Sequence, residues 1–201
     1  MRLATAALSG YLAGTLPSAD IAARLATGGA TDLRSTGSGN PGAANVIGVL
    51  GAKWGYGVLV ADIAKGAAGC GVGRRVAGPV GAHVGGTAAV IGHCFPLWNG
   101  FRGGKGVATS VGQCVATFPA YMGIDLSVAL ATSLSPRWKQ RAYAATAIAS
   151  ACWVGGGALW AWRGWPNLWA PHPTKALPFA AAVSSAVVLS KFAMAQSKQP
   201  A

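Results

Sequence analysis

Apolar residues are grouped along the chain in blocks that are too long for strands and too apolar for the surface helices of a soluble protein. Short polar stretches and turns rich in glycine or proline separate seven such segments. Their approximate bounds are 3–23, 54–73, 79–93, 105–117, 119–134, 142–162 and 177–194. Because a helix that crosses a bilayer needs about 20 mainly apolar residues, the pattern predicts an all-α, polytopic membrane protein. We expect about seven transmembrane helices in a single membrane domain over residues 1–201.

Small residues recur at four-residue spacing inside these segments. The pairs are Gly10 with Gly14, Gly51 with Gly55, Gly69 with Gly73, and Gly81 with Gly85. In lipid, this spacing lets helix backbones approach closely and gain van der Waals contact. The glycines therefore predict a compact helical bundle.

Composition supports the membrane assignment. Only 10% of the residues are charged, against about 25% in ordinary soluble domains, so a soluble fold could hardly cover its surface. Lys and Arg number 16 against four acidic residues, an excess that can also indicate nucleic-acid binding. Here, however, the basic residues lie between apolar segments and form no continuous stripe, which is typical of membrane topology. No nucleic-acid partner is expected.

The basic residues also predict an orientation. With the N-terminus outside and seven spans, nine basic residues fall on the inner side and five on the outer side. The inner set is Arg24, Arg34, Arg102, Lys105, Arg137, Lys139, Arg141, Lys191 and Lys198, and the outer set is Arg2, Arg74, Arg75, Arg163 and Lys175. The positive-inside rule then favours a cytoplasmic C-terminus. Two polar loops, 28–53 and 93–106, would share the cytoplasmic face.

The cysteines and tryptophans are expected to have structural roles. The four cysteines form no C-x-x-C pair and three lie in apolar stretches, where free Cys behaves as a small hydrophobe. Neither a disulfide nor a metal site is predicted. Five tryptophans, from Trp153 to Trp169, cluster around the sixth segment and are expected at the membrane interface.

The first loop, 28–53, contains three glycines in the spacing G-x-G-x-x-G. They are Gly37, Gly39 and Gly42. A dinucleotide-binding fold would require a preceding strand, and a membrane segment precedes the loop instead. The glycines still allow backbone N–H groups to approach an anion, while Ser38 and Asn40 add side-chain donors. A helix starting near Asn45 could add its N-terminus. The loop is either a phosphate site or a polar turn.

The second loop, 93–106, places two cations around a Gly-Gly pair at the start of the next segment. It is not a P-loop, because Gly106 and not Ser or Thr follows Lys105. Fixed cations, exposed amides and a helix N-terminus can nevertheless hold an anion. The candidate ligands are Arg102, Gly103, Gly104, Lys105 and Thr109. The two charges alone suit an ordinary positive-inside loop, whereas the intervening glycines favour a binding site.

Ionisable residues inside apolar segments are costly and therefore functional candidates. Two can be neutralised by a neighbour three or four residues away, Asp62 by Lys65 and Asp20 by Arg24. Asp125 has no such neighbour. His93 could act as a base or a phosphate donor, or could be a structural residue at a helix end. No His-x4-Asp arrangement and no credible Ser-His-Asp set occurs.

These residues resemble motifs of the bacterial acyl-phosphate:glycerol-3-phosphate acyltransferases, the PlsY family. G-S-G-N-x-G-A-x-N-V at 37–46 resembles the first motif, and D-x-x-K-G at 62–66 resembles the signature of the second segment. F-R-G-G-K-G-V-A-T at 101–109, after His93, resembles the second motif. The resemblance covers about residues 9–112.

The resemblance implies a seven-helix protein of the bacterial inner (plasma) membrane with its active site at the cytoplasmic face. It implies transfer of a fatty acyl group from acyl phosphate to sn-glycerol 3-phosphate, giving lysophosphatidic acid for phospholipid synthesis. No metal or cofactor is implied, and a phosphate of the substrate itself would act as the base. By position, the catalytic residues would be Ser38, Asn40 and Lys105. The substrate-binding residues would be Gly37, Gly39, Gly42, Asn45, His93, Arg102, Gly103, Gly104, Gly106 and Thr109.

The chain also departs from the family pattern. It has Ala44 where Thr is usual, Gly48 where Arg is usual, and no third motif, since it contains no Glu and no His after His172. Lys53 or Lys191 could replace the missing cations. Two alternatives therefore stand beside the active enzyme: a catalytically impaired paralogue that binds acyl phosphate or lipid, and a small-anion transporter.

Overall fold

A computed structural model describes residues 1–196 of the chain, and within them it contains helices and no strand. The α-helices are α1 (Arg2–Gly14), α2 (Ser18–Thr27), α3 (Ala43–Leu50), α4 (Ala52–Cys94), α5 (Val107–Thr117), α6 (Met122–Leu134), α7 (Arg141–Arg163) and α8 (Ala176–Gln196). Two 3-10 turns are η1 (Leu97–Asn99) and η2 (Pro119–Tyr121). All seven apolar segments are helical, which confirms the all-α prediction. Lys198, used in the orientation count, lies outside the described residues.

The first apolar segment is not one helix. Pro17 lacks a backbone N–H and cannot continue a helix without clash, so α1 ends at Gly14 and α2 starts at Ser18. The prediction of a continuous span over 3–23 is therefore wrong. At 13 residues, α1 is about 20 Å long, shorter than the roughly 30 Å hydrocarbon core of a bilayer.

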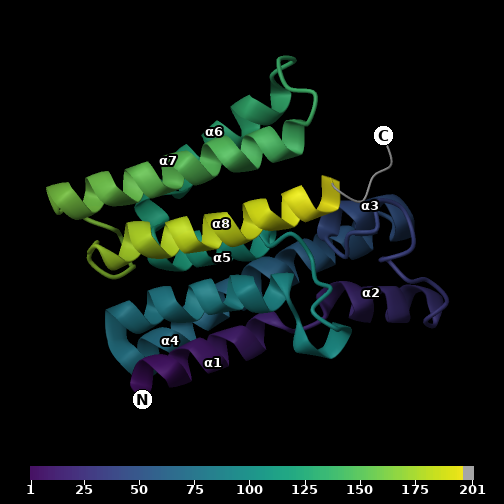
Figure 1. Cartoon of the computed structure of the whole chain (residues 1–201), viewed down its shortest axis with the longest axis horizontal. Helices are drawn as coiled ribbons and strands as arrows, with labels where there is room; N and C mark the ends of the chain where they lie inside the picture. Colours follow the sequence, from purple (N-terminus) through teal and green to yellow (C-terminus); the bar gives the residue numbers. More distant parts are fainter. Residues whose placement is uncertain (197–201) are drawn as a thin grey trace.

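The second and third segments, 54–73 and 79–93, form the two limbs of α4. The backbone leaves the helical region at Ala77 (φ −136°) and at Gly78 (φ 67°). Gly78 adopts a left-handed φ that side chains oppose, and Pro79 follows it. The two limbs fold back on each other at this break, at one end of the molecule (Figure 1).

Glycine permits close backbone contact between the helices. A Cβ atom would overlap a backbone carbonyl of the facing segment in several places: Gly10 against Gly85, Gly14 against Ala89, Gly73 against Gly81, and Gly112 against Ile63. These contacts confirm the packing predicted from four-residue spacing. Gly51 is the exception, because it ends α3 with φ 91° and faces open space.

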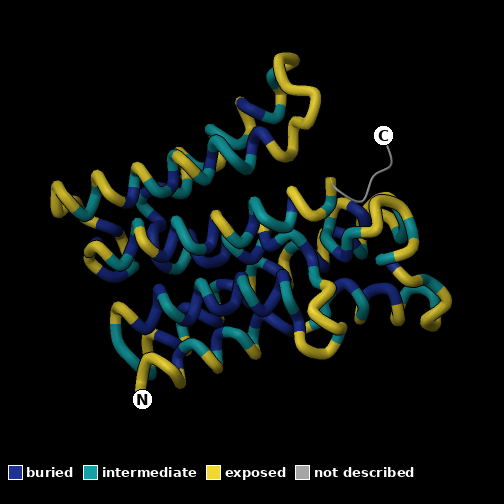
Figure 2. Tube along the Cα trace, in the orientation of Figure 1, coloured by how far each residue is buried: buried dark blue, intermediate teal, exposed yellow. Residues whose placement is uncertain are grey.

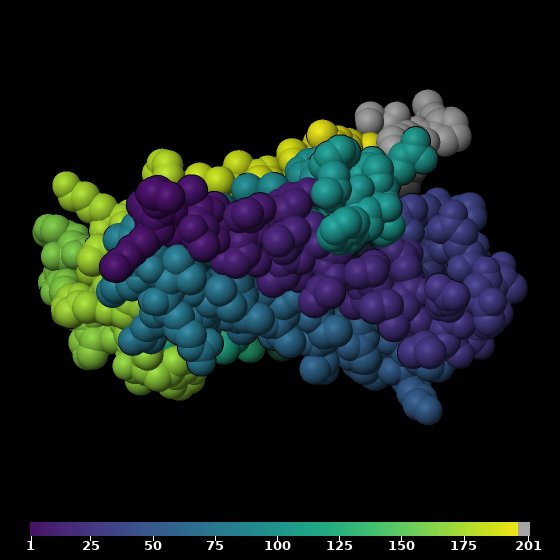
Figure 3. Space-filling view, turned by 90° about the horizontal axis from the view of Figure 1, so that it is seen from below, coloured from purple at the N-terminus to yellow at the C-terminus, as the bar shows by residue number. Residues whose placement is uncertain are grey.

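The helices stack in layers, with α6 and α7 at one side, α5 and α8 in the middle, and α1 and α4 at the other side (Figure 1). The helices α2 and α3, together with the C-terminal end of α8, gather at one end of these layers. Figure 3 shows α1 lying along α4, with the segment after α4 protruding beside it. Both polar loops therefore lie at the same end of the bundle.

The surface is that expected of a lipid-exposed bundle. Buried residues line the inner faces of the helices (Figure 2), while Leu8, Leu130 and Phe179 are 60% or more exposed. By length and apolar composition, α7 and α8 can cross a membrane, and α5 with α6 forms a third span if this pair, bent by 112°, is counted as one. Two to three spans are thus supported within residues 1–196.

Tryptophans divide into two groups. Trp162 and Trp169 are exposed near the segment that joins α7 to α8, as expected of interface residues. Trp153 is buried in a cluster with Phe118 and Tyr121, so its assignment to the interface is wrong. Trp153 lies on the face of α7 that packs against these aromatic residues, although it is close in sequence to the exposed tryptophans.

Candidate active site

The first loop is held in shape by one side chain. Asn45, in the first turn of α3, accepts a hydrogen bond from the Ser38 N–H (2.8 Å) and donates to the carbonyls of Leu33 (3.1 Å) and Thr36 (3.0 Å). Gly37 and Gly39 take left-handed φ angles between these contacts. The helix α3 begins at Ala43 inside the range 28–53, which agrees with the helix start expected near Asn45. Asn45 is 7% exposed, and the loop backbone occupies its amide group.

The second loop turns back on the end of α4. The Gly103 N–H donates to the carbonyl of Cys94 (3.2 Å), and Gly106 begins α5 with φ 86°. Gly104 is buried where a Cβ would collide with the His93 imidazole and come within 3.3 Å of the Pro41 carbonyl oxygen. Gly104 therefore brings the second loop into contact with the first.

Asp20 joins the two loops. Its carboxylate, on α2, accepts a two-pronged interaction from Arg34 of the first loop and a 2.6 Å hydrogen bond from Asn99 of the second. Arg34 also donates from Nε to the carbonyl of Arg102 (2.9 Å). The predicted Asp20–Arg24 pair is wrong, because the guanidinium of Arg34 reaches the carboxylate in bidentate geometry, which is stronger than a helical i,i+4 pair.

A second charged cluster lies beneath the loops. Lys65 and Asp62 form a buried ion pair with Nζ and Oδ1 2.9 Å apart, as the sequence predicts. Lys65 also donates to the Leu16 carbonyl (3.0 Å) at the break between α1 and α2, and Ser18 donates to Asp62. His93 places Nδ1 3.6 Å from Asp62. The break at Pro17 thus exposes a carbonyl that a buried lysine satisfies.

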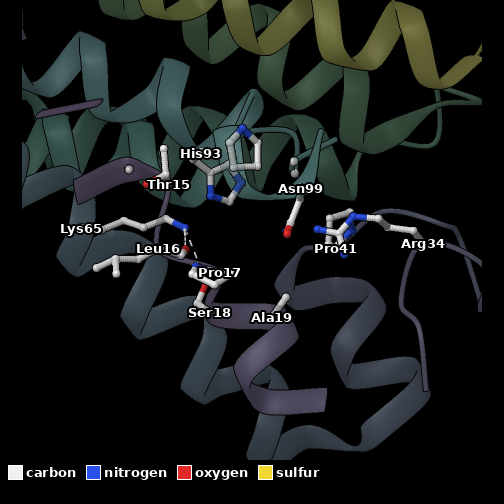
Figure 4. A pocket seen from close by; sticks show the side chains of 14 residues that line it. Thr15, Leu16, Pro17, Ser18, Ala19, Arg34, Pro41, Lys65, His93 and Asn99 are labelled. Atoms are coloured by element: carbon white, nitrogen blue, oxygen red, sulfur yellow. Dashed lines mark hydrogen bonds between the residues drawn. The ribbon is translucent and has the colours of Figure 1, made fainter. Parts of the chain in front are cut away.

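Two cavities open between these groups. The small cavity has about 20 Å³ of open space, and its polar lining residues are Thr15, Ser18, Arg34, Lys65, His93 and Asn99 (Figure 4). The large cleft has about 630 Å³ of open space and extends between α5, α6 and α7. His93 lines both, so the two cavities lie on either side of this residue.

The large cleft changes character along its length. Ser38, Asn40 and Lys105 line it at the loops. Farther in, its walls are largely aliphatic, with Val111, Leu126, Ala129, Leu130, Ala145 and Ala149 among them. A polar mouth and an apolar interior fit an amphiphile with an anionic head and a hydrocarbon chain.

Lys105 is the cation at this mouth. Its Nζ lies 4.3 Å from the centroid of the Phe192 ring, in cation–π geometry. Within residues 1–196 no carboxylate forms an ion pair with it. Burial lowers the pKa of Lys105 below its ordinary value, since desolvation disfavours the charged form. An anion bound next to Lys105 would raise this pKa again, because it stabilises the charged form of the side chain. The site therefore suits an anionic ligand.

The structure brings most of the predicted site residues to the two cavities. Gly42, Asn45 and Gly106 line the large cleft, and Gly103 and Gly104 line the small cavity. Arg102 is exposed and contributes its carbonyl to Arg34. Thr109 lines neither cavity, because it is completely buried.

Sequence reasoning did not assign Arg34, Asn99 or Ser18 to the site. In the sequence, Arg34 is only one of the basic residues that indicate membrane orientation. Asn99 lies before the Gly-Gly pair on which the prediction of an anion site is based. Ser18 becomes part of the site through the helix break at Pro17. The nearest signal in the sequence is that Arg34 and Asn99 fall within the two predicted loops, while Pro17 precedes Ser18 directly.

An apolar helical bundle with a large, mostly aliphatic cleft, opening at one end on two glycine-rich loops, defines a helical membrane protein with a ligand-sized cleft. The sequence model of the glycerol-3-phosphate acyltransferase family matches residues 4–195. The chain therefore belongs to the glycerol-3-phosphate acyltransferase family.

Relatives and solved structures agree with this assignment. The glycerol-3-phosphate acyltransferase of Agrobacterium fabrum is 40% identical over 136 residues, which cover 68% of this chain and 65% of the relative. The Anaeromyxobacter sp. enzyme of the same name is 50% identical over 109 residues, covering 52% and 53%. The matched region thus spans between about half and two thirds of the length of these relatives.

Structural similarity extends further along the chain. The crystal structure of PlsY, an integral membrane glycerol 3-phosphate acyltransferase, in its glycerol 3-phosphate form superposes with a TM-score of 0.75 at 28% identity, covering 98% of this chain and 92% of that one. Its lysophosphatidic acid form gives 0.77 at 26% identity, covering 98% and 91%.

Proposed function

We propose that the protein transfers a fatty acyl group from acyl phosphate to sn-glycerol 3-phosphate, forming lysophosphatidic acid and releasing phosphate. The observation that carries the proposal is the large cleft, whose mouth holds Ser38, Asn40 and Lys105 and whose interior is aliphatic. Membership of the glycerol-3-phosphate acyltransferase family supports the same reaction.

The donor would occupy the large cleft, with its chain between α5, α6 and α7 and its phosphate at the mouth. Lys105 would contribute positive charge, and Ser38 and Asn40 would contribute hydrogen-bond donors. In a largely apolar cleft, such fixed charges and dipoles act more strongly than in water. Replacing Lys105 should therefore reduce the transfer rate more than replacing a surface lysine.

The acceptor would bind at the small cavity, where Arg34, Lys65, His93 and Asn99 gather. Its free volume of about 20 Å³ holds about one water molecule, so the two loops would have to move apart to admit glycerol 3-phosphate. Arg34 has five N–H donors, of which three make the contacts to Asp20 and Arg102. The remaining donors suit a phosphate. This arrangement would place positive charge beside the acceptor.

Chemistry would take place between the two cavities. The 1-hydroxyl oxygen of the acceptor attacks the acyl carbonyl carbon and forms the ester bond. The bond between that carbon and the phosphate oxygen breaks, and the hydroxyl proton passes to the departing phosphate. Acyl phosphate is already activated, so orientation of the reactants and stabilisation of the oxyanion supply most of the rate. His93 would position the reactants from between the cavities.

We place both loops at the cytoplasmic face of a bacterial inner membrane, with about seven crossings and the N-terminus outside. The excess of basic residues at the loop end supports this orientation. Labelling of single cysteines in intact cells tests it. A cysteine at Ser35 should resist an impermeant reagent, while one at Thr174 should react, and the reverse pattern would contradict the orientation.

The activity is tested with purified protein in detergent, palmitoyl phosphate and labelled glycerol 3-phosphate. We expect consumption of the donor that depends on the acceptor, with lysophosphatidic acid as the product. Lys105→Ala should reduce the rate by at least about 100-fold, the loss seen when a preorganised electrostatic contact is removed. Lys175→Ala, an exposed lysine at the opposite end, is the matched control. Donor consumption without the acceptor, or none at all, would contradict the proposal.

A further inference from the structure

The deep end of the large cleft is unexpectedly polar. Asp125 lines the cleft from α6, and Ser150 and Trp153 line it from α7. The shallower walls are largely aliphatic, and their hydroxyls bond within their own helices, so a plain hydrocarbon chain would meet these polar groups last. A carboxyl group inside a membrane protein is costly and requires a reason.

Hairpin topology places these residues at one level. The helices α6 and α7 pack against each other and are joined by residues 135–140, so they run antiparallel. The cleft-lining residues of α6 begin at Asp125 and those of α7 end at Trp153, and both positions lie farthest from the connecting turn. Along α7, Trp153 is 11 residues beyond Ala142, or about 16 Å at the helical rise. Ala142 lies at the mouth, since it lines a cavity with Lys105.

The deep polar groups differ from the hydroxyls on the helical walls between them and the mouth. Ser110, Ser133 and Thr146 each donate to a carbonyl of their own helix at 2.8 Å. In the described part of the chain, neither the Asp125 carboxyl nor the Ser150 hydroxyl has a hydrogen-bond partner.

Trp153 closes the cleft at the same level. Its side chain is 5% exposed and packs in a cluster with Phe118 and Tyr121, so it forms an apolar end wall. One carboxylate and one hydroxyl, those of Asp125 and Ser150, therefore lie unpaired near the far end of a largely aliphatic cleft.

We propose that this end of the cleft is a binding subsite for an oxygenated acyl chain, namely one that carries a hydroxyl group at a fixed distance from its carbonyl. The hydroxyl would donate to Asp125 and accept from Ser150. A plain chain of equal length would leave these groups desolvated and unpaired, which disfavours its binding. The inference rests on the proposed acyl transfer and specifies its donor.

The test compares palmitoyl phosphate with a series of hydroxypalmitoyl phosphates that differ in hydroxyl position. With the purified full-length protein, one position should give a kcat/KM at least about tenfold above that of the plain donor, the ratio expected for one buried hydrogen bond. Asp125→Leu should remove that preference, and Asp125→Asn should keep part of it. Ser127→Leu, on α6 outside the cleft, should preserve it.

The outcomes separate this inference from the proposed function. A wild-type protein that transfers the plain donor as well as every hydroxylated one overturns the subsite. A preference that survives Asp125→Leu overturns its assignment to Asp125. If no donor is transferred, the proposed reaction fails, and displacement of a fluorescent fatty acid by the same compounds still decides the subsite. Equal displacement by plain and hydroxylated chains would then overturn it.

Discussion

Asp20 lies outside the predicted site, yet it connects the loops that form the site. Replacing Asp20 with Asn preserves the shape of the side chain but removes the charge that Arg34 binds. It also turns an amide N–H₂ group towards the guanidinium or towards Asn99, which already donates to this carboxylate. The substitution should therefore separate the first loop from the second without creating a cavity.

The magnitude follows from the exposure of the pair. The side chains of Arg34 and Asp20 are 22% and 33% exposed, so solvent screens them more than a buried pair but less than a surface pair. We take about 1–3 kcal/mol for the charge-assisted bonds lost, between the values for exposed and fully buried pairs. If the loops must stay together for transfer, kcat/KM should fall about 5- to 150-fold.

Lysophosphatidic acid formation at saturating donor and varied glycerol 3-phosphate measures the effect. Asp32→Asn is the matched control, because Asp32 is 61% exposed and 3.9 Å from the same guanidinium. The Asp32 Oδ1 accepts a hydrogen bond from the backbone N–H of Arg34, and the side-chain oxygen of Asn can accept the same bond. Wild-type kcat/KM in Asp20→Asn, or an equal loss in Asp32→Asn, would refute the role of Asp20.

Three further predictions concern charge and packing. Because burial lowers the pKa of Lys105 and only its protonated form attracts phosphate, kcat/KM for acyl phosphate should hold below that pKa and fall as pH rises through it; Lys105→Arg should move the fall to higher pH, and an unmoved profile would argue against Lys105. Lys65→Met removes the cation that neutralises Asp62 and leaves only the Ser18 hydroxyl and the His93 ring beside this carboxylate, so it should destabilise the protein by about 3–5 kcal/mol. The double variant with Asp62→Leu should recover most of the thermal stability, and no recovery would contradict the pairing. Gly112→Val should lower the melting temperature in detergent, since a Cβ there overlaps Ile63, and an unchanged melting temperature would show that the helices can separate freely.

Hydrophobic patterning predicts the helices of this fold because lipid and core both require apolar faces. It does not predict how the first segment breaks. Pro17 lies within an otherwise apolar run, and only tertiary contacts decide whether such a residue kinks a helix or ends it. Here Lys65 satisfies the Leu16 carbonyl that the break frees, and α2 turns away to bring Asp20 towards the loops.

Predictions for the site divide according to the range of the interaction. The Asp62–Lys65 pair was predictable because three residues on a helix separate the partners. The Asp20–Arg34 pair was not, because it depends on how the first loop folds around Asn45. The short motif likewise marks Asn45 as a candidate site residue. It does not show that the Asn45 amide group is already bonded to the carbonyls of the loop.

The most direct test of the account is a crystal structure of the protein bound to a non-hydrolysable acyl phosphonate. We predict phosphonate oxygens within hydrogen-bonding distance of the Ser38, Asn40 and Lys105 side chains, with the acyl chain between α6 and α7. A phosphonate bound away from Lys105, or a chain outside the large cleft, would contradict the claim that the two loops form one anion site.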